Sequence, residues 1–481
     1  MNEGKRTPVR LPRHGRGVIA VFCGLLLFAA GCKSTSHSSS GGGQSPAAGL
    51  CCESGVDLSL TRAAMEALIQ RAVERPVSST LLPAAWQGLI AQAKKVGVHI
   101  GDDAAPRFTG DPKDDFAAFN DAFDKLIAGH HGAVDVTQLN YAAIDKMAQS
   151  LGDTHTSFLP PLQATLSQRR EAGNLGTSTG IRLERVTERP PIVLEVDPDS
   201  AGTDAGVVPG DTVISLNGQQ VQTFTPGQVR RTLEGPDGSK LKLDIRHAGS
   251  ARLQTVTLTR RTTSENLVHS AVLPGNVGYI RIREFPEQVP IQLQVRQALQ
   301  DFDASQTDGV IVDLRGNPGG STLVLQAILS EFVSQTPLAY SVVPRGGVQP
   351  MARVGPFNLH QRVVVLTDDG SASAAEIFAA AVQEYGDGLI VGAPTCGCLV
   401  EAEFVPIDGD KSQLEIGEAR ILTPVQQREI EKSPVLPDRP AGADPRLLSQ
   451  GRDPQLEAAL VSLGVSDATA RTALRAIVAG G

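Results

Sequence analysis

Apolar residues in the first third of the chain recur at every third or fourth position. This spacing puts them on one face of a helix, so it favours helices over strands here. It predicts helices over residues 58–75, 82–95 and 114–128. We assign them to a helical N-terminal region at residues 55–172.

The pattern changes beyond residue 174, where short runs of apolar and β-branched residues are separated by Gly and Pro. Such runs are typical of a small β-rich module. We place this module at residues 174–262. Its predicted strands cover residues 191–196, 211–216, 240–246 and 253–259.

Strand-like and helical patterns alternate from residue 277 onward. Strands are predicted over residues 277–283, 310–314 and 362–367, and helices over residues 291–303 and 374–385. This alternation indicates an α/β sheet. We therefore expect an α/β core at residues 270–465, followed by a short tail at residues 466–481.

Length and charge narrow the possible functions. A chain of 481 residues is long enough for about three domains. The net charge is −8, and the first 31 residues carry five Lys or Arg against one Glu, so the remainder is more acidic still. A chain of this charge offers no basic surface for nucleic acid. We expect no nucleic-acid partner.

The N-terminus has the features of an export signal. Five basic residues precede an apolar run at residues 18–30, which as a helix would span roughly 20 Å, too short for a bilayer. The small residues before Cys32 resemble the lipobox of bacterial lipoproteins, which implies a signal peptide at residues 1–31, lipidation of Cys32 and a flexible tether at residues 32–54. Ordinary signal cleavage and an uncleaved anchor remain alternatives. The expected location is the bacterial cell envelope, lipid-anchored to the membrane and facing the periplasm.

Four cysteines remain besides Cys23 in the leader and Cys32, namely Cys51, Cys52, Cys396 and Cys398. An exported protein can form disulfides. Vicinal and Cys-x-Cys pairs close small, strained rings, so bridges between the two clusters are one hypothesis. Reduced or locally paired thiols are the other, and the connectivity stays open. No histidine adjoins these cysteines, so we expect no metal site and no cofactor.

The middle module carries three glycine-rich turns. A loop at residues 175–181 leads into a strand, Ala205-Gly206-Val207-Val208-Pro209-Gly210-Asp211 precedes Ser215-Leu216-Asn217-Gly218, and residues 233–239 precede two alternating strands. Together these segments resemble a bacterial PDZ domain. The resemblance implies that an extended peptide binds by strand addition, with its C-terminal carboxylate near Gly176, Gly180 and Ile181. The alternative is a small β-sandwich without a ligand.

Two segments of the α/β core could carry chemistry. The predicted strand at residues 310–314 runs into the turn Arg315-Gly316-Asn317-Pro318-Gly319-Gly320, whose backbone amides could hold an oxyanion. The strand at residues 362–367 is followed by Gly370-Ser371-Ala372-Ser373-Ala374-Ala375-Glu376. A serine at a helix N-terminus is favourably placed for nucleophilic chemistry. The same residues also form a capping box, which needs no chemistry.

The order of these segments resembles the carboxyl-terminal processing (tail-specific) proteases, peptidase family S41. Residues 151–159, 390–395 and Pro437-Asp438 also match that family's pattern. The resemblance implies an α/β core of the ClpP/crotonase-like S41 type, with a PDZ domain inserted after a helical region. It also implies that Ser373 is the nucleophile. The oxyanion would then be held by the N–H groups of Ala374 and of Gly320 or Gly319.

The chain departs from this family at the position of the general base. Ser/Lys members carry a lysine where this chain has Cys398, and a glutamine where it has Ala402. A thiol is mostly protonated at neutral pH, and an oxidised cysteine provides no base. One branch of the family uses Ser, His and Glu, so His155 is the alternative base; it could instead be a structural histidine of its turn.

We therefore predict a serine peptidase that cleaves periplasmic proteins recognised by their free C-termini through the PDZ domain. The alternative is a catalytically impaired pseudoprotease that acts as a peptide-binding adaptor. A third possibility, a thiol redox protein built on Cys396 and Cys398, lacks a thioredoxin-like pattern.

Overall fold

A computed structural model describes residues 57–98, 106–127, 135–171, 177–186, 189–224, 226–262, 267–344, 346–355, 359–407 and 409–473. The predicted signal peptide, the tether, Cys32, Cys51, Cys52 and Gly176 lie outside these residues. Among the described helices, none is long and apolar enough to cross a membrane.

The N-terminal region is built mainly from helices. They are α1 (Ser59–Arg71), α2 (Ser78–Lys95), α3 (Pro112–Ile127), α4 (Val136–Ser150) and α5 (Pro161–Glu171). On α3, Phe116, Phe119 and Phe123 follow one another at three- and four-residue spacing, and all three are buried. The apolar periodicity of the sequence therefore corresponds to a real buried face.

The N-terminal region also contributes a strand, which its helical periodicity did not predict. β1 (Ser157–Leu159) pairs antiparallel with β18 (Gln413–Leu422). The resulting sheet has the order β1-β18-β13-β14, and β17 (Val400–Pro406) pairs with the same strand β18. Its other members are β13 (Ala339–Val343) and β14 (Gly347–Met351). Since β1 has only three residues, it is too short to show an alternating pattern.

The central sheet has the strand order β10-β11-β12-β15-β16-β19. β11 (Val277–Ile282), β12 (Gly309–Asp313), β15 (Arg362–Thr367), β16 (Gly388–Gly392) and β19 (Arg439–Pro440) are parallel, and β10 (Val268–Leu273) is antiparallel to β11. All residues of β11 and β12 are buried, as expected for parallel strands covered on both faces.

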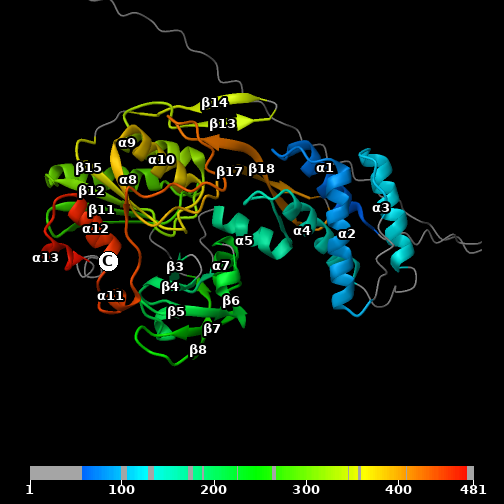
Figure 1. Ribbon diagram of the computed structural model, residues 1–481, viewed down its shortest axis with the longest axis horizontal. Helices are drawn as coiled ribbons and strands as arrows, with labels where there is room; N and C mark the ends of the chain where they lie inside the picture. Colours follow the sequence, from blue (N-terminus) through cyan, green and yellow to red (C-terminus); the bar gives the residue numbers. More distant parts are fainter. Residues whose placement is uncertain are drawn as a thin grey trace, which may run out of the picture. The chain divides into compact units, whose positions relative to one another are not determined.

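Helices cover both faces of this sheet. α8 (Ile291–Ala304), α9 (Thr322–Phe332) and α10 (Ala374–Tyr385) pack on one face (Figure 1). α12 (Pro454–Ser462) and α13 (Asp467–Ala470) pack on the other. Because Ala470 and Ala473 belong to this core, the predicted tail at residues 466–481 begins as packed structure, which corrects that boundary.

The middle module is a separate antiparallel sheet with the order β3-β4-β5-β7-β8. Its strands are β3 (Ile181–Val186), β4 (Arg189–Val196), β5 (Thr212–Leu216), β7 (Lys240–Arg246) and β8 (Gln254–Thr259), with β6 (Gln219–Gln220) beside β5. The short helices α6 (Ala201–Asp204) and α7 (Pro226–Leu233) complete it. β2 (Thr177–Ser178) pairs with β9 (Arg261–Thr262) where the chain enters and leaves the module.

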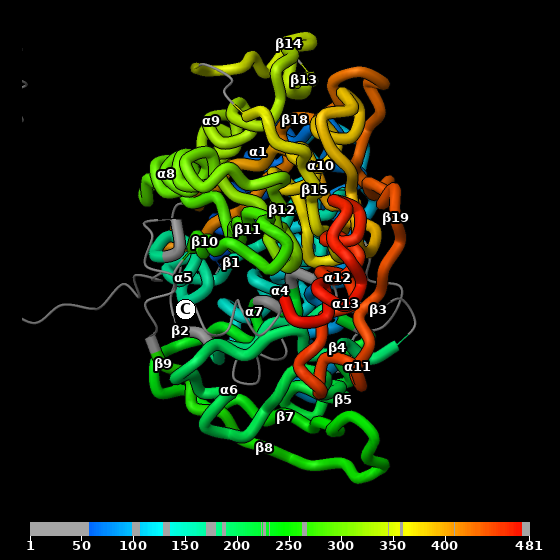
Figure 2. The backbone as a smooth tube through the Cα atoms, turned by 90° about the vertical axis from the view of Figure 1, so that its left-hand side faces the viewer, coloured from blue at the N-terminus to red at the C-terminus, as the bar shows by residue number. Residues whose placement is uncertain are grey.

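Charged side chains join the middle module to the central sheet. Glu195 of β4 forms ion pairs with Arg182 of β3, at 3.0 Å, and with Arg281 of β11. Asp197 pairs with Arg283 at 2.6 Å. Figure 1 and Figure 2 both place α11 (Pro445–Ser449) next to the sheet of the middle module, where Leu448 packs on β4. The module is therefore fixed to the core by several contacts.

Candidate active site

The two glycine-rich turns meet at the carboxyl ends of β12 and β15. One oxygen of the Asp368 carboxylate accepts the N–H of Gly316 at 2.8 Å, and the Ser371 hydroxyl donates to the carbonyl of Leu314 at 2.8 Å. The N–H of Ala372 donates to the carbonyl of Asn317 at 2.9 Å. Ligands of open α/β sheets bind at this end of the strands. The two segments singled out in the sequence therefore form one site.

Ser373 lies at the tip of the second turn, directly before α10, and is partly exposed. Its φ is +52° and its ψ is −120°. A residue that only caps a helix normally has extended φ and ψ, so this left-handed conformation is strained. The capping interaction also forms, since the Glu376 carboxylate accepts the N–H of Ser373 at 3.1 Å. Capping and exposure of the serine therefore coexist.

The first turn packs directly against the serine. A Cβ atom added to Gly319 would lie 2.6 Å from the Cβ of Ser373 and 2.9 Å from the nitrogen of Ala374. The N–H of Gly319 donates to the Asn317 side chain at 2.8 Å, so it is not available to an oxyanion. Of the two candidate glycines, this leaves Gly320. The oxyanion donors are expected to be the N–H groups of Gly320 and Ala374.

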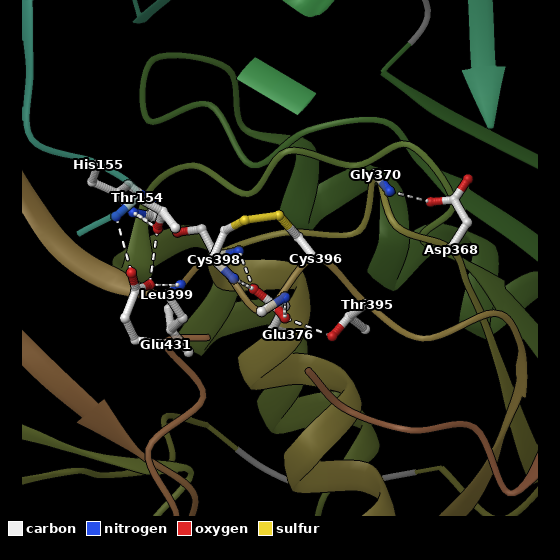
Figure 3. The surroundings of a disulfide bond; sticks show 12 residues. Thr154, His155, Asp368, Gly370, Glu376, Thr395, Cys396, Cys398, Leu399 and Glu431 are labelled. Carbon is white, nitrogen blue, oxygen red and sulfur yellow. Dashed lines mark hydrogen bonds between the residues drawn. A yellow bond between two sulfur atoms is a disulfide. The ribbon is translucent and has the colours of Figure 1, made fainter. Parts of the chain in front are cut away.

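Cys398 forms a disulfide with Cys396, with the two Cα atoms 5.1 Å apart (Figure 3). The hypothesis of bridges from this cluster to Cys51 and Cys52 is therefore wrong, and Cys396 and Cys398 are locally paired, as the alternative had it. The intervening Gly397 has a φ of +68°, a conformation open to glycine that lets the chain turn sharply between the two cysteines. Since its sulfur is oxidised, Cys398 cannot serve as the general base.

Glu376 is a buried carboxylate next to the disulfide. It accepts hydrogen bonds from the Thr395 hydroxyl at 2.5 Å, from the N–H of Gly397 at 2.7 Å and from the N–H of Cys398 at 2.9 Å, besides that of Ser373. Burial raises the pKa of the Glu376 carboxyl to about 7, against the opposing effect of these donors. The carboxylate joins the serine turn to the disulfide segment.

His155 belongs to a chain of hydrogen bonds that ends on a carboxylate. The Thr154 hydroxyl donates to Glu431 at 2.8 Å and lies 3.0 Å from Nδ1 of His155. The backbone N–H of Thr154 donates to the same carboxylate at 2.9 Å. A carboxylate only accepts, so the hydroxyl proton is engaged and the hydroxyl oxygen must accept from Nδ1–H. Nε2 of the neutral ring is then left as a proton acceptor.

Sequence reasoning missed Thr154, Glu376 and Glu431 as site residues. Thr154 could have been noticed, because a hydroxyl directly before a candidate histidine can reach its ring. Glu376 was interpreted only as a cap. Glu431 lies in the loop between β18 and β19, where no local pattern points to it.

The predicted peptide-binding residues are in the middle module. Ile181 is buried at the start of β3, which is an edge strand of the module's sheet. Gly180 has a φ of +69°, and a Cβ atom there would lie 2.1 Å from that of Ser200. The Arg182 side chain of β3 lies 3.2 Å from the position of a Cβ added to Gly316. This edge strand therefore contacts the turn that precedes the oxyanion residues.

Comparison with known proteins agrees with both parts of this architecture. The sequence model of peptidase family S41 matches residues 276–441, and that of the PDZ domain matches residues 192–247. A carboxyl-terminal-processing protease of Synechocystis sp. is 31% identical over 310 residues, which cover 62% of this chain and 70% of the relative. The carboxy-terminal processing protease CtpA of Bacillus subtilis is 30% identical over 294 residues, covering 60% of this chain and 61% of the relative.

The fold is also that of a solved protease. The photosystem II D1 C-terminal processing protease superposes with a TM-score of 0.56 at 22% identity, covering 86% of this chain and 99% of that chain. The likeness at this identity concerns the fold. Together with the relative matched over 70% of its length, these findings show that the chain belongs to the carboxyl-terminal processing proteases, serine peptidases of family S41 that here carry a PDZ domain.

Proposed function

We propose that the protein is an active serine peptidase in which His155, in place of the missing lysine, takes the proton from Ser373. The observation that carries this proposal is the hydrogen-bonded chain from His155 through Thr154 to Glu431. It fixes the ring so that Nε2 is free to accept a proton. A serine hydroxyl needs such a partner to become a useful nucleophile.

The reaction then follows the course of a serine peptidase. Ser373 attacks the peptide carbonyl while its proton passes to His155. The N–H groups of Gly320 and Ala374 hold the oxyanion, which is typically the largest single contribution to the rate. The Glu431 charge stabilises the imidazolium through Thr154. His155 next gives its proton to the leaving amine, and water hydrolyses the acyl-enzyme with the same histidine as base.

Labelling with a fluorophosphonate tests this proposal directly. The intact protein should label at Ser373, and Ser373→Ala should abolish the label. His155→Ala should slow labelling by about 10²-fold or more, as general-base catalysis contributes roughly 10²–10⁴-fold. His360→Ala, a change at an exposed histidine, serves as the matched control and should label at the parental rate. Equal labelling by the parent and His155→Ala would overturn His155 as the base.

The proposed substrates are periplasmic proteins recognised by their C-terminal tails through the PDZ domain. β3 is an edge strand, so a tail can add to its sheet, with its carboxylate near Gly180 and Ile181. Since Arg182 of the same strand packs at Gly316, a bound tail would lie close to the catalytic turns. The tail would thus be held where its own chain can enter the site.

The predicted export and lipidation complete the proposal. A lipid on Cys32 would tether the peptidase to the membrane, facing the periplasm. Membrane fractionation tests this, with Cys32→Ser expected in the soluble fraction and the parent in the membrane fraction. The reverse result, or no difference between the two proteins, would contradict the lipid anchor.

The disulfide at the lysine position favours one alternative, a pseudoprotease that binds tails as an adaptor. The two functions differ in what Ser373→Ala does. For the peptidase the substitution abolishes hydrolysis and leaves tail binding intact. For the adaptor the parent and Ser373→Ala would be equally inactive and would bind tails equally well.

A further inference from the structure

The disulfide segment contacts both halves of the proposed catalytic machinery. Three consecutive backbone N–H groups point to two carboxylates: those of Gly397 and Cys398 donate to Glu376, and that of Leu399 donates to Glu431 at 3.0 Å. Glu376 lies in the first turn of α10, the helix that follows the nucleophile, and Glu431 ends the hydrogen-bonded chain of His155. In Figure 3 the disulfide lies next to Glu376, and Glu431 lies on the Cys398 side, near Leu399.

The same segment holds the serine turn through its main chain. The N–H of Ser373 donates to the carbonyl of Cys398 at 3.0 Å, and the N–H of Cys396 donates to the carbonyl of Ser371 at 2.9 Å. On the opposite side, the carbonyl of Gly397 accepts the N–H of Lys432 at 2.7 Å. Lys432 follows Glu431 in the chain, so the segment links the serine turn to the loop that carries Glu431.

We propose that the Cys396–Cys398 bridge is a positioning element that holds Ser373 in register with the His155 chain, so that hydrolysis depends on the redox state of this bridge. This proposal rests on the proposed role of His155. Ser373 is held in a strained conformation, which persists only where its surroundings fix it from several sides. Opening the bridge removes the covalent restraint on the segment whose three consecutive backbone N–H groups donate to Glu376 and Glu431.

Reduction of the bridge requires an external thiol. A dithiol transfers two electrons and two protons to the disulfide, which becomes the two thiols of Cys396 and Cys398, while the dithiol closes to its own disulfide. Both cysteines are partly exposed, so a reductant can reach them. Because the bridge closes a very short loop, it restrains the unfolded chain little, and its loss should affect local geometry more than global stability.

The test compares hydrolysis of a tail peptide by the oxidised and the reduced protein, in a Cys51→Ser/Cys52→Ser background that removes other bridges. Reduction should lower kcat by about tenfold or more while KM changes little, since small misplacements of reacting groups are costly. Reoxidation should restore kcat. Cys396→Ser/Cys398→Ser should have the low kcat of the reduced protein and should not respond to dithiol.

Amide hydrogen exchange gives a readout that does not require activity. The N–H groups of Gly397, Cys398 and Leu399 should exchange faster after reduction, with an unchanged melting temperature. Unchanged kcat and unchanged exchange on reduction would overturn the proposal, as would a dithiol response of Cys396→Ser/Cys398→Ser. Faster exchange in a protein that labels Ser373 in neither redox state would contradict the proposed function but not the positioning role of the bridge.

Discussion

The backbone N–H of Ser373 donates a hydrogen bond to the carbonyl oxygen of Cys398 at 3.0 Å. Related proteases of the Ser/Lys type are expected to have their lysine at this position, where its side chain would serve as the base. In this chain residue 398 meets the nucleophile through its main chain, and its sulfur is bonded to Cys396. Residue 398 therefore supports the serine turn and provides no base, so His155 is the candidate for that role.

The Thr154 hydroxyl is expected to be necessary for the activity of His155. Thr154→Val keeps the shape of the side chain but removes the hydroxyl between His155 and Glu431, so the ring loses the hydrogen bond that fixes its orientation. We expect kcat for a tail peptide to fall by roughly 10–100-fold, less than the roughly 10²–10⁴-fold of a lost general base, because the histidine itself remains.

Thr257→Val is the matched control for this variant, because Thr257 is an exposed residue of β8 far along the chain from the site. It should keep the parental kcat. A Thr154→Val protein with parental kinetics would show that the hydrogen-bonded chain plays no part in catalysis.

Gly319→Ala should disable the site by contact with the nucleophile. The added Cβ would lie 2.6 Å from the Cβ of Ser373, closer than such atoms approach, and the φ of +98° adds backbone strain. We expect the rate of fluorophosphonate labelling to fall by about 10²-fold, the effect of a misplacement of about 1 Å. The test is the rate constant of fluorophosphonate labelling of Ser373, measured for folded Gly319→Ala and parental protein.

A variant at a second glycine introduces backbone strain without a contact to the nucleophile. Gly218 has a φ of +79°, and an added Cβ there would meet no atom within 4 Å. Gly218→Ala should therefore lower the free energy of unfolding by roughly 1–2 kcal/mol, the cost of the left-handed conformation, without slowing the labelling of Ser373. Equal labelling rates for the two glycine variants would refute the predicted contact.

Glu184 should make stability depend on pH. Burial, and next the charge of Asp368, raise the pKa of the Glu184 carboxyl to about 8, while Arg315 opposes the shift. The native state then keeps a proton that the unfolded chain loses above its ordinary value of 4.5. This contribution to stability is complete below pH 4.5 and is lost as the pH rises through about 8, with a slope of up to about 1.4 kcal/mol per pH unit.

Urea unfolding between pH 5 and 9 tests whether the free energy of unfolding falls as the pH rises. Glu184→Gln should remove the Glu184 part of the decline and leave the part that comes from Glu376. Its amide stays neutral and can still meet Gln455, which contacts Glu184 at 3.1 Å in the parent. Glu66→Gln, a change at an exposed residue of α1, should leave the decline in place. A parental protein whose stability rises between pH 5 and 8 would contradict the assignment.

Tail recognition should depend on a free C-terminal carboxylate. A peptide that adds to β3 forms main-chain hydrogen bonds whether its C-terminus is free or amidated. Only a free C-terminal carboxylate can also accept hydrogen bonds from the backbone amides near Gly180. We expect amidation of the C-terminus to weaken binding to the intact Ser373→Ala protein by about tenfold, the loss of one charge-assisted hydrogen bond. Isothermal titration of the two peptides measures this, and equal Kd values would rule out carboxylate recognition.

Local patterns in the sequence predict the main helices and strands of the three regions and their order along the chain. The apolar runs of β11, β12 and β15 and the three-four spacing of α8 and α10 are local, so they could be predicted to within a few residues. Ser373 could be placed between a strand and a helix for the same reason. The sequence alone also shows that residue 398 is a cysteine, so the general base cannot be a lysine at this position.

The assembly of the site depends on contacts that form only when the chain has folded. The contact between Thr154 and Glu431 joins residues 277 positions apart, and no local spacing encodes such a contact. The sequence left open whether the cysteines pair between or within their clusters; Cys396 pairs with Cys398, because the left-handed turn at Gly397 brings them together. The choice of Gly320 over Gly319 likewise depended on Asn317, whose side chain occupies one of the two amides only once the turn has folded. These features rest on distances across the fold, which the sequence leaves open until the chain has packed.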